Sequence, residues 1–121
     1  MAKLLVVEDD EATRELLDHI LTSAGYEVRQ AEDGRKGLDA VARERPDLIL
    51  LDIMLPEVHG YSVCHQVKSD PATKGVKVLM LSAKAFAADR RQAEEAGADG
   101  FLAKPVNPAE LLQAIKNLLG G

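Results

Sequence analysis

The sequence has few of the features that mark secreted, membrane-bound or nucleic-acid-binding proteins. It contains one cysteine, Cys64, so it can form no internal disulfide, and it has no Cys/His spacing typical of a zinc site. No apolar run approaches the roughly 18 residues of a membrane-spanning helix, and Met1 leads into a strand-like run without a signal peptide. Acidic residues outnumber basic ones by 20 to 15, so there is no positive footprint for nucleic acid or anionic lipid. We therefore expect a cytoplasmic protein that binds neither nucleic acid directly nor a membrane.

Within its 121 residues the chain alternates apolar runs with helical patterns. This length corresponds to one domain, and a hydrophobic fraction of 46% is enough for a packed core. Strands are expected at residues 4–7, 26–29, 48–51, 76–81 and 99–103. Strands that alternate with helices predict an α/β protein, in which helices cover both faces of a parallel sheet.

The expected helices have recognisable stripes and ends. In the first helix, Leu16, Leu17, Ile20, Leu21 and Ala24 fall on one helical face, and Gly25 follows at the usual C-terminal position. The second is expected to begin at Asp33-Gly34 and to stop before Pro46. Further helices are expected between a loop with Pro56 and the Asp70-Pro71 turn, and from Phe86 to Gly97. The last helix has Asn107 as N-cap, Pro108 at its first position and Glu110 in a capping-box pattern.

Polar residues follow four of the strand-like runs. Glu8-Asp9-Asp10 follow the first run, Asp52 the third, Ser82 the fourth and Lys104 the fifth. Ligands of an open parallel sheet bind outside the carboxyl ends of its strands, so these groups would gather at one edge. A cluster of carboxylates with a hydroxyl and a lysine suits a divalent cation and a phosphoryl group.

Each of these residues has an ordinary explanation when taken alone. The acidic run could be a charge cluster at a helix N-terminus, and Asp10 fits best as the N-cap. Ser82 and Lys104 could be solvated surface groups. The combination is more specific: carboxylates held close repel one another unless a cation lies between them, and Mg²⁺ prefers such oxygen ligands. We expect Ser82 and Lys104 to be the only donors at this edge without other partners, and the Lys104-Pro105 bond is a candidate for a cis peptide.

Several segments together resemble the receiver domain of response regulators in two-component signalling. They are Val6-Val7-Glu8-Asp9-Asp10, Leu50 to Pro56, Val78 to Lys84, Gly97-Ala98-Asp99 and Lys104-Pro105. Each motif is weak alone, but their order and spacing are specific. The resemblance covers residues 4–119 and implies that residues 1–121 form one receiver domain. It also implies a flavodoxin-like fold, with a five-stranded parallel sheet of order 2-1-3-4-5 and five helices on its two faces.

The resemblance also implies roles for single residues. Asp52 would be the phosphoacceptor, with Ser82 and Lys104 contacting the phosphoryl group and Phe101 acting as the switch aromatic. Mg²⁺ would be the cofactor, and no further cofactor site is expected. Its implied ligands are Asp52, Asp9, Glu8 through water, and the main-chain carbonyl of Met54.

The implied partners are a sensor histidine kinase or a histidine phosphotransfer protein, and a downstream protein or output domain. The face built from the fourth helix, fifth strand and fifth helix would change on phosphorylation and promote partner binding, with a homodimer as one form. Two features depart from the commonest pattern: His59 stands where many relatives carry an acid, and the helix after Ser82 lacks an acidic run. We expect His59 to be an exposed loop residue, and His19 and His65 to lie on the surface.

Three other functions agree less well with the sequence. A pseudo-receiver, acting only as a protein-binding module, would be expected to lack Asp52, Asp9 or Lys104, which are all present. A phosphatase with an aspartyl-phosphate intermediate needs a second acid two residues after the nucleophile, where this chain has Met54. A nucleotide-binding protein would need a glycine-rich loop after the first strand. We therefore expect a phosphoacceptor that is not a turnover enzyme.

Overall fold

Five parallel strands form the centre of the molecule in this computed structural model, which describes residues 2–55, 58–83 and 87–120. The strands are β1 (Lys3–Val7), β2 (Glu27–Ala31), β3 (Leu48–Asp52), β4 (Lys77–Ser82) and β5 (Gly100–Ala103). Their order across the sheet is β2-β1-β3-β4-β5, which confirms the predicted flavodoxin-like arrangement. Among the described residues, no helix is long and apolar enough to cross a membrane.

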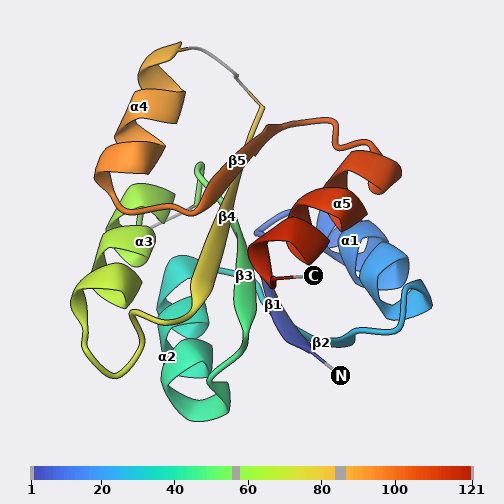
Figure 1. Cartoon of the computed structure of the whole chain (residues 1–121), viewed down its shortest axis with the longest axis horizontal. Coiled ribbons are helices and arrows are strands. Elements are labelled where there is room, and N and C mark those ends of the chain that lie inside the picture. Colours follow the sequence, from blue (N-terminus) through green and yellow to red (C-terminus); the bar gives the residue numbers. More distant parts are fainter. Residues whose placement is uncertain (1, 56–57, 84–86, 121) are drawn as a thin grey trace.

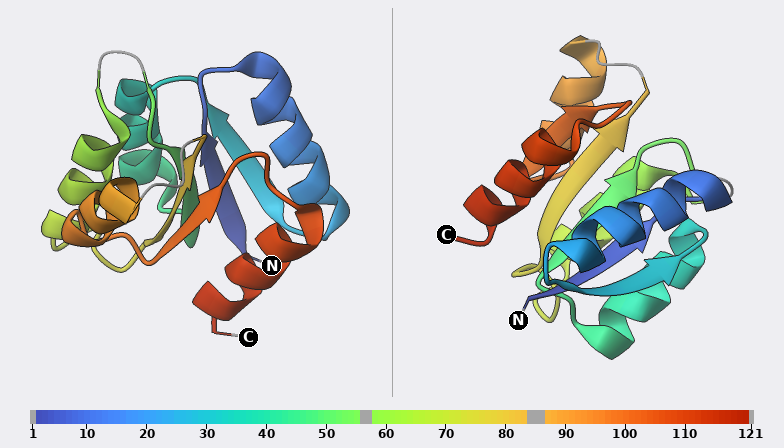
Figure 2. Two further views of the ribbon diagram at one scale, coloured as in Figure 1. Left: turned by 90° about the horizontal axis from the view of Figure 1, so that it is seen from above. Right: turned by 90° about the vertical axis from the view of Figure 1, so that its right-hand side faces the viewer.

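Five helices cover the two faces of the sheet (Figures 1 and 2). On one side lie α1 (Glu11–Ser23) and α5 (Pro108–Leu118); on the other lie α2 (Gly34–Glu44), α3 (Gly60–Ser69) and α4 (Ala87–Glu95). Strand residues alternate between the two faces. The side chains of β1 therefore divide between two cores: Leu4 and Val6 pack with α1 and α5, whereas Leu5 and Val7 pack with the α2 and α3 side.

The central strands are buried on both faces, as their continuous apolar runs predict. All five residues of β3 are buried, from Leu48 to Asp52. The register pairs Val7 of β1 with Leu51 of β3, and Asp52 with Leu81 of β4. The carboxyl ends of these three strands therefore lie at one level, and this positions the polar residues that follow them.

The structure confirms several predicted helix ends. Asp10 and Asn107 are the N-caps of α1 and α5, and Pro108 occupies the first turn of α5. Gly25, just beyond α1, has a φ of +96°, a left-handed conformation that favours glycine. The expected helix start at Phe86 and the loop residue Pro56 lie outside the described residues.

The structure differs from the sequence pattern in two details. Leu16 is 56% exposed and Ala24 is exposed, because the face of α1 that meets the sheet is set by Leu17 and Leu21, one turn apart. Leu16 instead lines a groove of about 350 Å³ with Pro105 and Val106. The second strand begins at Glu27 rather than at residue 26 and continues to Ala31, because its pairing with β1 extends to Val7.

Candidate functional site

Three carboxylates converge where β1 and β3 end. Glu8 and Asp9 follow β1, Asp52 is the last residue of β3, and the two strands are neighbours. One carboxylate oxygen from each of the three residues lies within 4.8 Å of the others. Glu8 and Asp52 are only 1% and 5% exposed, whereas Asp9 is exposed. The predicted convergence of Asp9 and Asp52 is confirmed.

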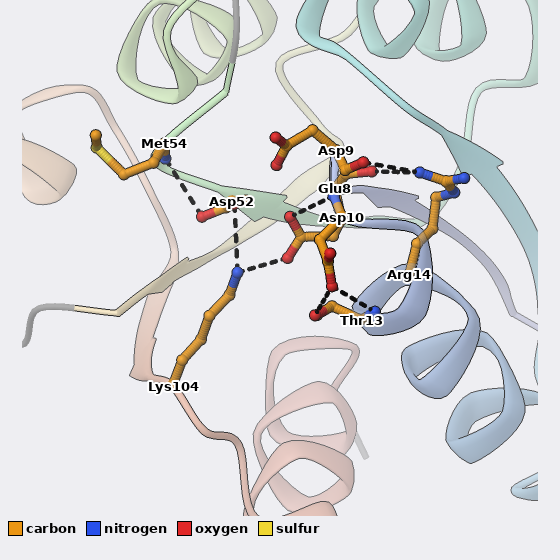
Figure 3. Close-up of polar contacts among 8 residues, drawn as sticks. All are labelled: Glu8, Asp9, Asp10, Thr13, Arg14, Asp52, Met54 and Lys104. Atoms are coloured by element: carbon orange, nitrogen blue, oxygen red, sulfur yellow. Dashed lines mark hydrogen bonds and ion pairs between the residues drawn. The ribbon is translucent and has the colours of Figure 1, made fainter.

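Lys104 reaches this cluster from the loop after β5 (Figure 3). Its Nζ lies 2.5 Å from Glu8 Oε1 and 3.3 Å from Asp52 Oδ2. The main-chain N–H of Lys104 donates to the carbonyl of Ser82 at 2.7 Å, which ties the start of this loop to the end of β4. The Lys104-Pro105 peptide bond is cis, as predicted.

The expectation that Ser82 and Lys104 have no other partners is wrong. The ammonium of Lys104 already bridges two buried carboxylates, and Ser82 is not without interactions either. The physical reason lies in the burial of Glu8 and Asp52. An ionised carboxylate removed from water is costly unless an opposite charge or hydrogen bonds compensate it, and Lys104 supplies both.

The electrostatics of the cluster favour the addition of positive charge. Burial raises the pKa of Glu8, and the neighbouring Asp52 carboxyl raises it further. Loss of hydration and the hydrogen bond with Glu8 likewise raise the pKa of Asp9. Burial alone would lower the pKa of Lys104, but its hydrogen bond with Glu8 and the charge of Asp52 raise that pKa overall.

The set of donors fits a hard divalent cation. Three ionised carboxylates and one ammonium leave a formal charge of −2 among these four side chains. All three candidate ligand atoms that converge are carboxylate oxygens. Oxygen-only ligands with few carboxylates are typical of Mg²⁺, which keeps several of its waters. The residues present therefore fit the cofactor that the sequence predicted.

The turn after β3 fixes the other oxygen of Asp52. The main-chain N–H of Met54 donates to Asp52 Oδ1 at 3.3 Å, and that of Ile53 donates to the carbonyl of Leu81 at 3.0 Å. The Met54 side chain is 67% exposed, so it points away from the core. Its main-chain carbonyl belongs to the same turn, and the role of that carbonyl as a metal ligand stays a prediction.

Ser82 and Phe101 lie on different parts of the sheet. Ser82 ends β4, is 3% exposed, and follows Leu81, the register partner of Asp52. Phe101 lies in β5, half-buried against the core on the α2 and α3 side of the sheet. The Arg90 guanidinium of α4 lies 5.3 Å from the centre of its ring. The sheet thus places Ser82 at the strand ends that carry the acidic cluster, whereas Phe101 lies beside α4, away from that cluster.

Sequence reasoning missed the role of Arg14 in the acidic loop. Arg14 Nη1 donates to the main-chain carbonyl of Glu8 at 2.9 Å and to that of Asp9 at 3.5 Å. The available signal was its position one turn into the first helix, because helical side chains point back towards the N-terminus and thus towards the preceding loop.

The three histidines lie on the surface, as predicted, but His59 also has a local function. It is the N-cap of α3, and its Nδ1 accepts from the main-chain N–H of Tyr61 at 3.3 Å. Its ring stacks on that of Tyr61, with 4.9 Å between the ring centres. His19 and His65 are exposed on α1 and α3. None of the three is among the residues of the acidic cluster.

Comparison with known proteins agrees with this geometry. The family model of the response regulator receiver domain matches residues 4–116. The chain is 41% identical over 119 residues to the DNA-binding dual master transcriptional regulator RpaA of Synechocystis, covering 98% of this chain but 49% of RpaA. The chain thus spans about half of the length of that curated relative.

Two solved structures extend the similarity to three dimensions. A crystal structure from Chloroflexus aurantiacus J-10-fl has a TM-score of 0.95 at 39% identity, covering 99% of this chain and 98% of that one. The receiver domain of sensor histidine kinase PA1611 from Pseudomonas aeruginosa PAO1 has a TM-score of 0.92 at 32% identity, with coverage of 99% and 98%. That structure holds a magnesium ion coordinated in its active site cleft.

Proposed function

The chain belongs to the response regulator receiver domain family, and from this membership we propose that it is a signalling switch operated by phosphorylation of Asp52. A histidine kinase or a histidine phosphotransfer protein would donate the phosphoryl group. The observation that carries the proposal is the buried Asp52 carboxylate, which lies 3.3 Å from Lys104 and within an acidic cluster suited to Mg²⁺.

The geometry supports Asp52 as the nucleophile. Met54 N–H holds one of its oxygens and Lys104 the other, so the carboxylate is oriented before a donor arrives. A carboxylate oxygen forms a bond to phosphorus while the bond from phosphorus to the donor's imidazole nitrogen breaks. The electron pair of that bond stays on the nitrogen, and an acyl phosphate remains on Asp52. Lys104 can then exchange one carboxylate partner for a phosphoryl oxygen.

The proposed Mg²⁺ site consists of Asp52, Asp9, Glu8 through water, and the Met54 carbonyl. When bound, the ion would neutralise charge between the carboxylate nucleophile and the phosphoryl oxygens. Glu8 contributes a buried negative charge that also orients Lys104. The magnesium-containing relative and the oxygen-only donor set both support this choice of cofactor.

The response to phosphorylation would pass through Ser82 and Phe101 to the face formed by α4, β5 and α5. We propose that this face binds a downstream protein or output domain, or a second copy of the chain. We propose that residues 1–121 form one receiver domain, which accepts a phosphoryl group without catalysing turnover of a substrate. The cytoplasmic location and the lack of direct nucleic-acid contact stay predictions from the sequence.

Intact-mass measurement with a phosphodonor tests the proposal. The parent chain, incubated with acetyl phosphate and Mg²⁺, should gain one phosphoryl group, and Asp52→Asn should gain none. Asp47→Asn is the matched control, because Asp47 is an exposed aspartate just before β3, at the opposite end of that strand from Asp52. A chelator should abolish the adduct in the parent. An adduct that persists in Asp52→Asn would refute the acceptor assignment, and no adduct in the parent would favour the pseudo-receiver.

A further inference from the structure

Arg14 connects the acidic loop to two regular elements of the fold. In Figure 3 its guanidinium lies beside the carbonyl groups of Glu8 and Asp9, on the side away from Lys104. Nη1 donates to both carbonyl oxygens, at 2.9 and 3.5 Å. Nε donates to Oε1 of Gln30 in β2 at 3.1 Å. One side chain of α1 thus holds the backbone of two candidate metal ligands and a neighbouring strand.

The network continues beyond Gln30. Its Nε2 donates to Oδ2 of Asp18 at 2.5 Å, which returns the connection to α1 one turn after Arg14. An arginine suits this place because its planar guanidinium presents several N–H groups in fixed directions. Lysine has a single nitrogen at its tip and would not bond Gln30 and the two carbonyls with the same geometry. The guanidinium orientation is therefore fixed from two sides.

The loop needs such support because it carries like charges in sequence. Glu8, Asp9 and Asp10 are consecutive acids, and carboxylate oxygens of Glu8 and Asp9 converge with one of Asp52 within 4.8 Å. Glu8 N–H is held by the carbonyl of Ala31 at 3.1 Å, which fixes one side of the backbone. Arg14 holds the opposite groups, the carbonyl oxygens. These contacts together fix the main-chain positions from which the Glu8 and Asp9 side chains project.

We propose that Arg14 is a positioning residue for the cation site, acting through the main chain of Glu8 and Asp9 and oriented by Gln30. The inference rests on the proposed Mg²⁺-dependent function and adds a residue that contacts neither the acceptor nor the metal ligands' carboxylates. Residues that orient metal ligands from behind typically change metal affinity by about 10- to 100-fold when they are removed.

The sign of the effect separates positioning from simple electrostatics. Removing a positive charge beside an anionic site should strengthen the binding of a cation if charge alone matters. Loss of positioning should weaken it. Arg14→Ala is therefore expected to weaken Mg²⁺ binding by about tenfold, against the electrostatic expectation. Gln30→Ala changes no charge and should weaken binding by a smaller factor, because Arg14 loses its orientation.

The experiment is an NMR titration of Mg²⁺ into the parent, Arg14→Ala, Gln30→Ala and the double variant. Arg29→Ala is the matched control: it removes the same charge one residue from Gln30, but its ion pairs are with Glu27 and Glu44. It should bind Mg²⁺ as tightly as the parent or slightly more tightly. In the Arg14→Ala background, Gln30→Ala should have no further effect on affinity. Thermal unfolding of each variant monitors the fold.

The outcomes are distinct for the two proposals. The inference is supported if Arg14→Ala binds Mg²⁺ more weakly than the parent and if Gln30→Ala causes no further loss of affinity in the Arg14→Ala background. Unchanged or tighter binding in Arg14→Ala, or additive effects of the two substitutions, overturns it while the proposed function stands. A parent that binds no Mg²⁺ overturns both. If Arg14→Ala does not fold, the exposed Gln30→Ala decides: parent-like affinity in that variant would overturn the inference.

Discussion

Gly60 lies so close to Asp52 that a Cβ at this position would be 2.4 Å from the Asp52 carbonyl oxygen. The same atom would be 2.7 Å from the Cα of Ile53. Both contacts are with backbone, which has no flexible end that could move aside. Gly60 N–H also donates to the carbonyl of Ile53 at 3.0 Å. The first residue of α3 is thus packed directly against the end of the strand that carries the proposed acceptor.

Gly60→Ala is therefore expected to displace the end of β3 or the start of α3. Overpacking of this kind typically costs about 1–3 kcal/mol of unfolding free energy. The initial rate of Asp52 phosphorylation should fall as well, because the carboxylate moves relative to Lys104. Chemical denaturation and intact-mass kinetics measure the two effects. Gly75→Ala is the control, because no atom beyond its two neighbours in the chain lies within 4 Å of the Cβ it would add. Equal behaviour of the two variants would refute the argument.

Asp9 and Asp10 should have separable roles although they are adjacent. Asp9 belongs to the cluster of three carboxylates, whereas Asp10 accepts from the N–H and the hydroxyl of Thr13, at 2.9 and 2.5 Å, as the N-cap of α1. Asp9→Ala should abolish measurable Mg²⁺ binding with little change in thermal stability. Asp10→Ala should lower the thermal midpoint and retain binding. Equal loss of Mg²⁺ affinity in the two variants, measured by NMR titration, would contradict this division.

Cys64 should be unreactive in the folded protein. It is fully buried in α3, its Sγ donates to the carbonyl of Ala96 at 3.4 Å, and burial raises the pKa of its thiol to about 11. From the ordinary value of 9.0, the thiolate fraction at pH 8 falls about a hundredfold, and burial slows access further. Alkylation followed by mass spectrometry should therefore modify Cys64 rapidly in denaturant and very slowly without it. Similar rates in the two conditions would show that the α3 core opens readily.

The raised pKa of Cys64 also makes the free energy of unfolding depend on pH. Between pH 9 and about 11 the unfolded chain loses the thiol proton while the folded chain keeps it. The unfolded state then binds fewer protons, so the free energy of unfolding falls as the pH rises through this range. The stabilisation that the protonated Cys64 thiol gives to the folded state is fully present below pH 9.

The sheet and the acidic cluster could be predicted because strong local signals agree with one another. The apolar runs of β3 and β4 are buried on both faces, and polar residues follow them at the same level. Parallel strand order then brings Asp9, Asp52 and Lys104 together. The exposure of Leu16 could not be predicted in this way, since one apolar residue beside Leu17 fits a helical stripe whether or not the sheet reaches it.

The partners of polar groups were less accessible from the sequence. Lys104 bridges Glu8 and Asp52 before any phosphoryl group is present. This depends on burial of the two carboxylates, which is a tertiary property that the sequence does not show directly. The contact of Arg14 with the acidic loop depends on a side-chain orientation that spacing only suggests. His59 as an N-cap was missed because histidine is not among the common capping residues.

Ser82→Ala tests the coupling between phosphorylation of Asp52 and the face formed by α4, β5 and α5. Phosphorylation adds about two negative charges and three acceptor oxygens, which should draw the Ser82 hydroxyl towards them. Movement of Ser82 vacates space that the ring of Phe101 is expected to fill. Ser82→Ala should therefore still accept a phosphoryl group on Asp52 but respond weakly. Amide shifts of residues 87–102, with and without beryllofluoride, measure the response; equal shifts in parent and variant would refute the coupling.

Arg90→Ala should shift the resting position of Phe101. The guanidinium lies 5.3 Å from the ring centre, a geometry that contributes about 0.5–1 kcal/mol at an exposed site and favours the half-buried ring position seen here. Without this contact, an equilibrium between this ring position and the more buried one expected on phosphorylation should move towards the more buried one by a factor of about two to five. Without beryllofluoride, the residue 101 amide should lie part of the way towards its position in the beryllofluoride-bound parent. Arg91→Ala, an exposed neighbour in the same helix, removes the same charge and should leave this shift unchanged. If instead Arg90→Ala matches the parent, or moves the resonance in the opposite direction, Arg90 does not hold the ring.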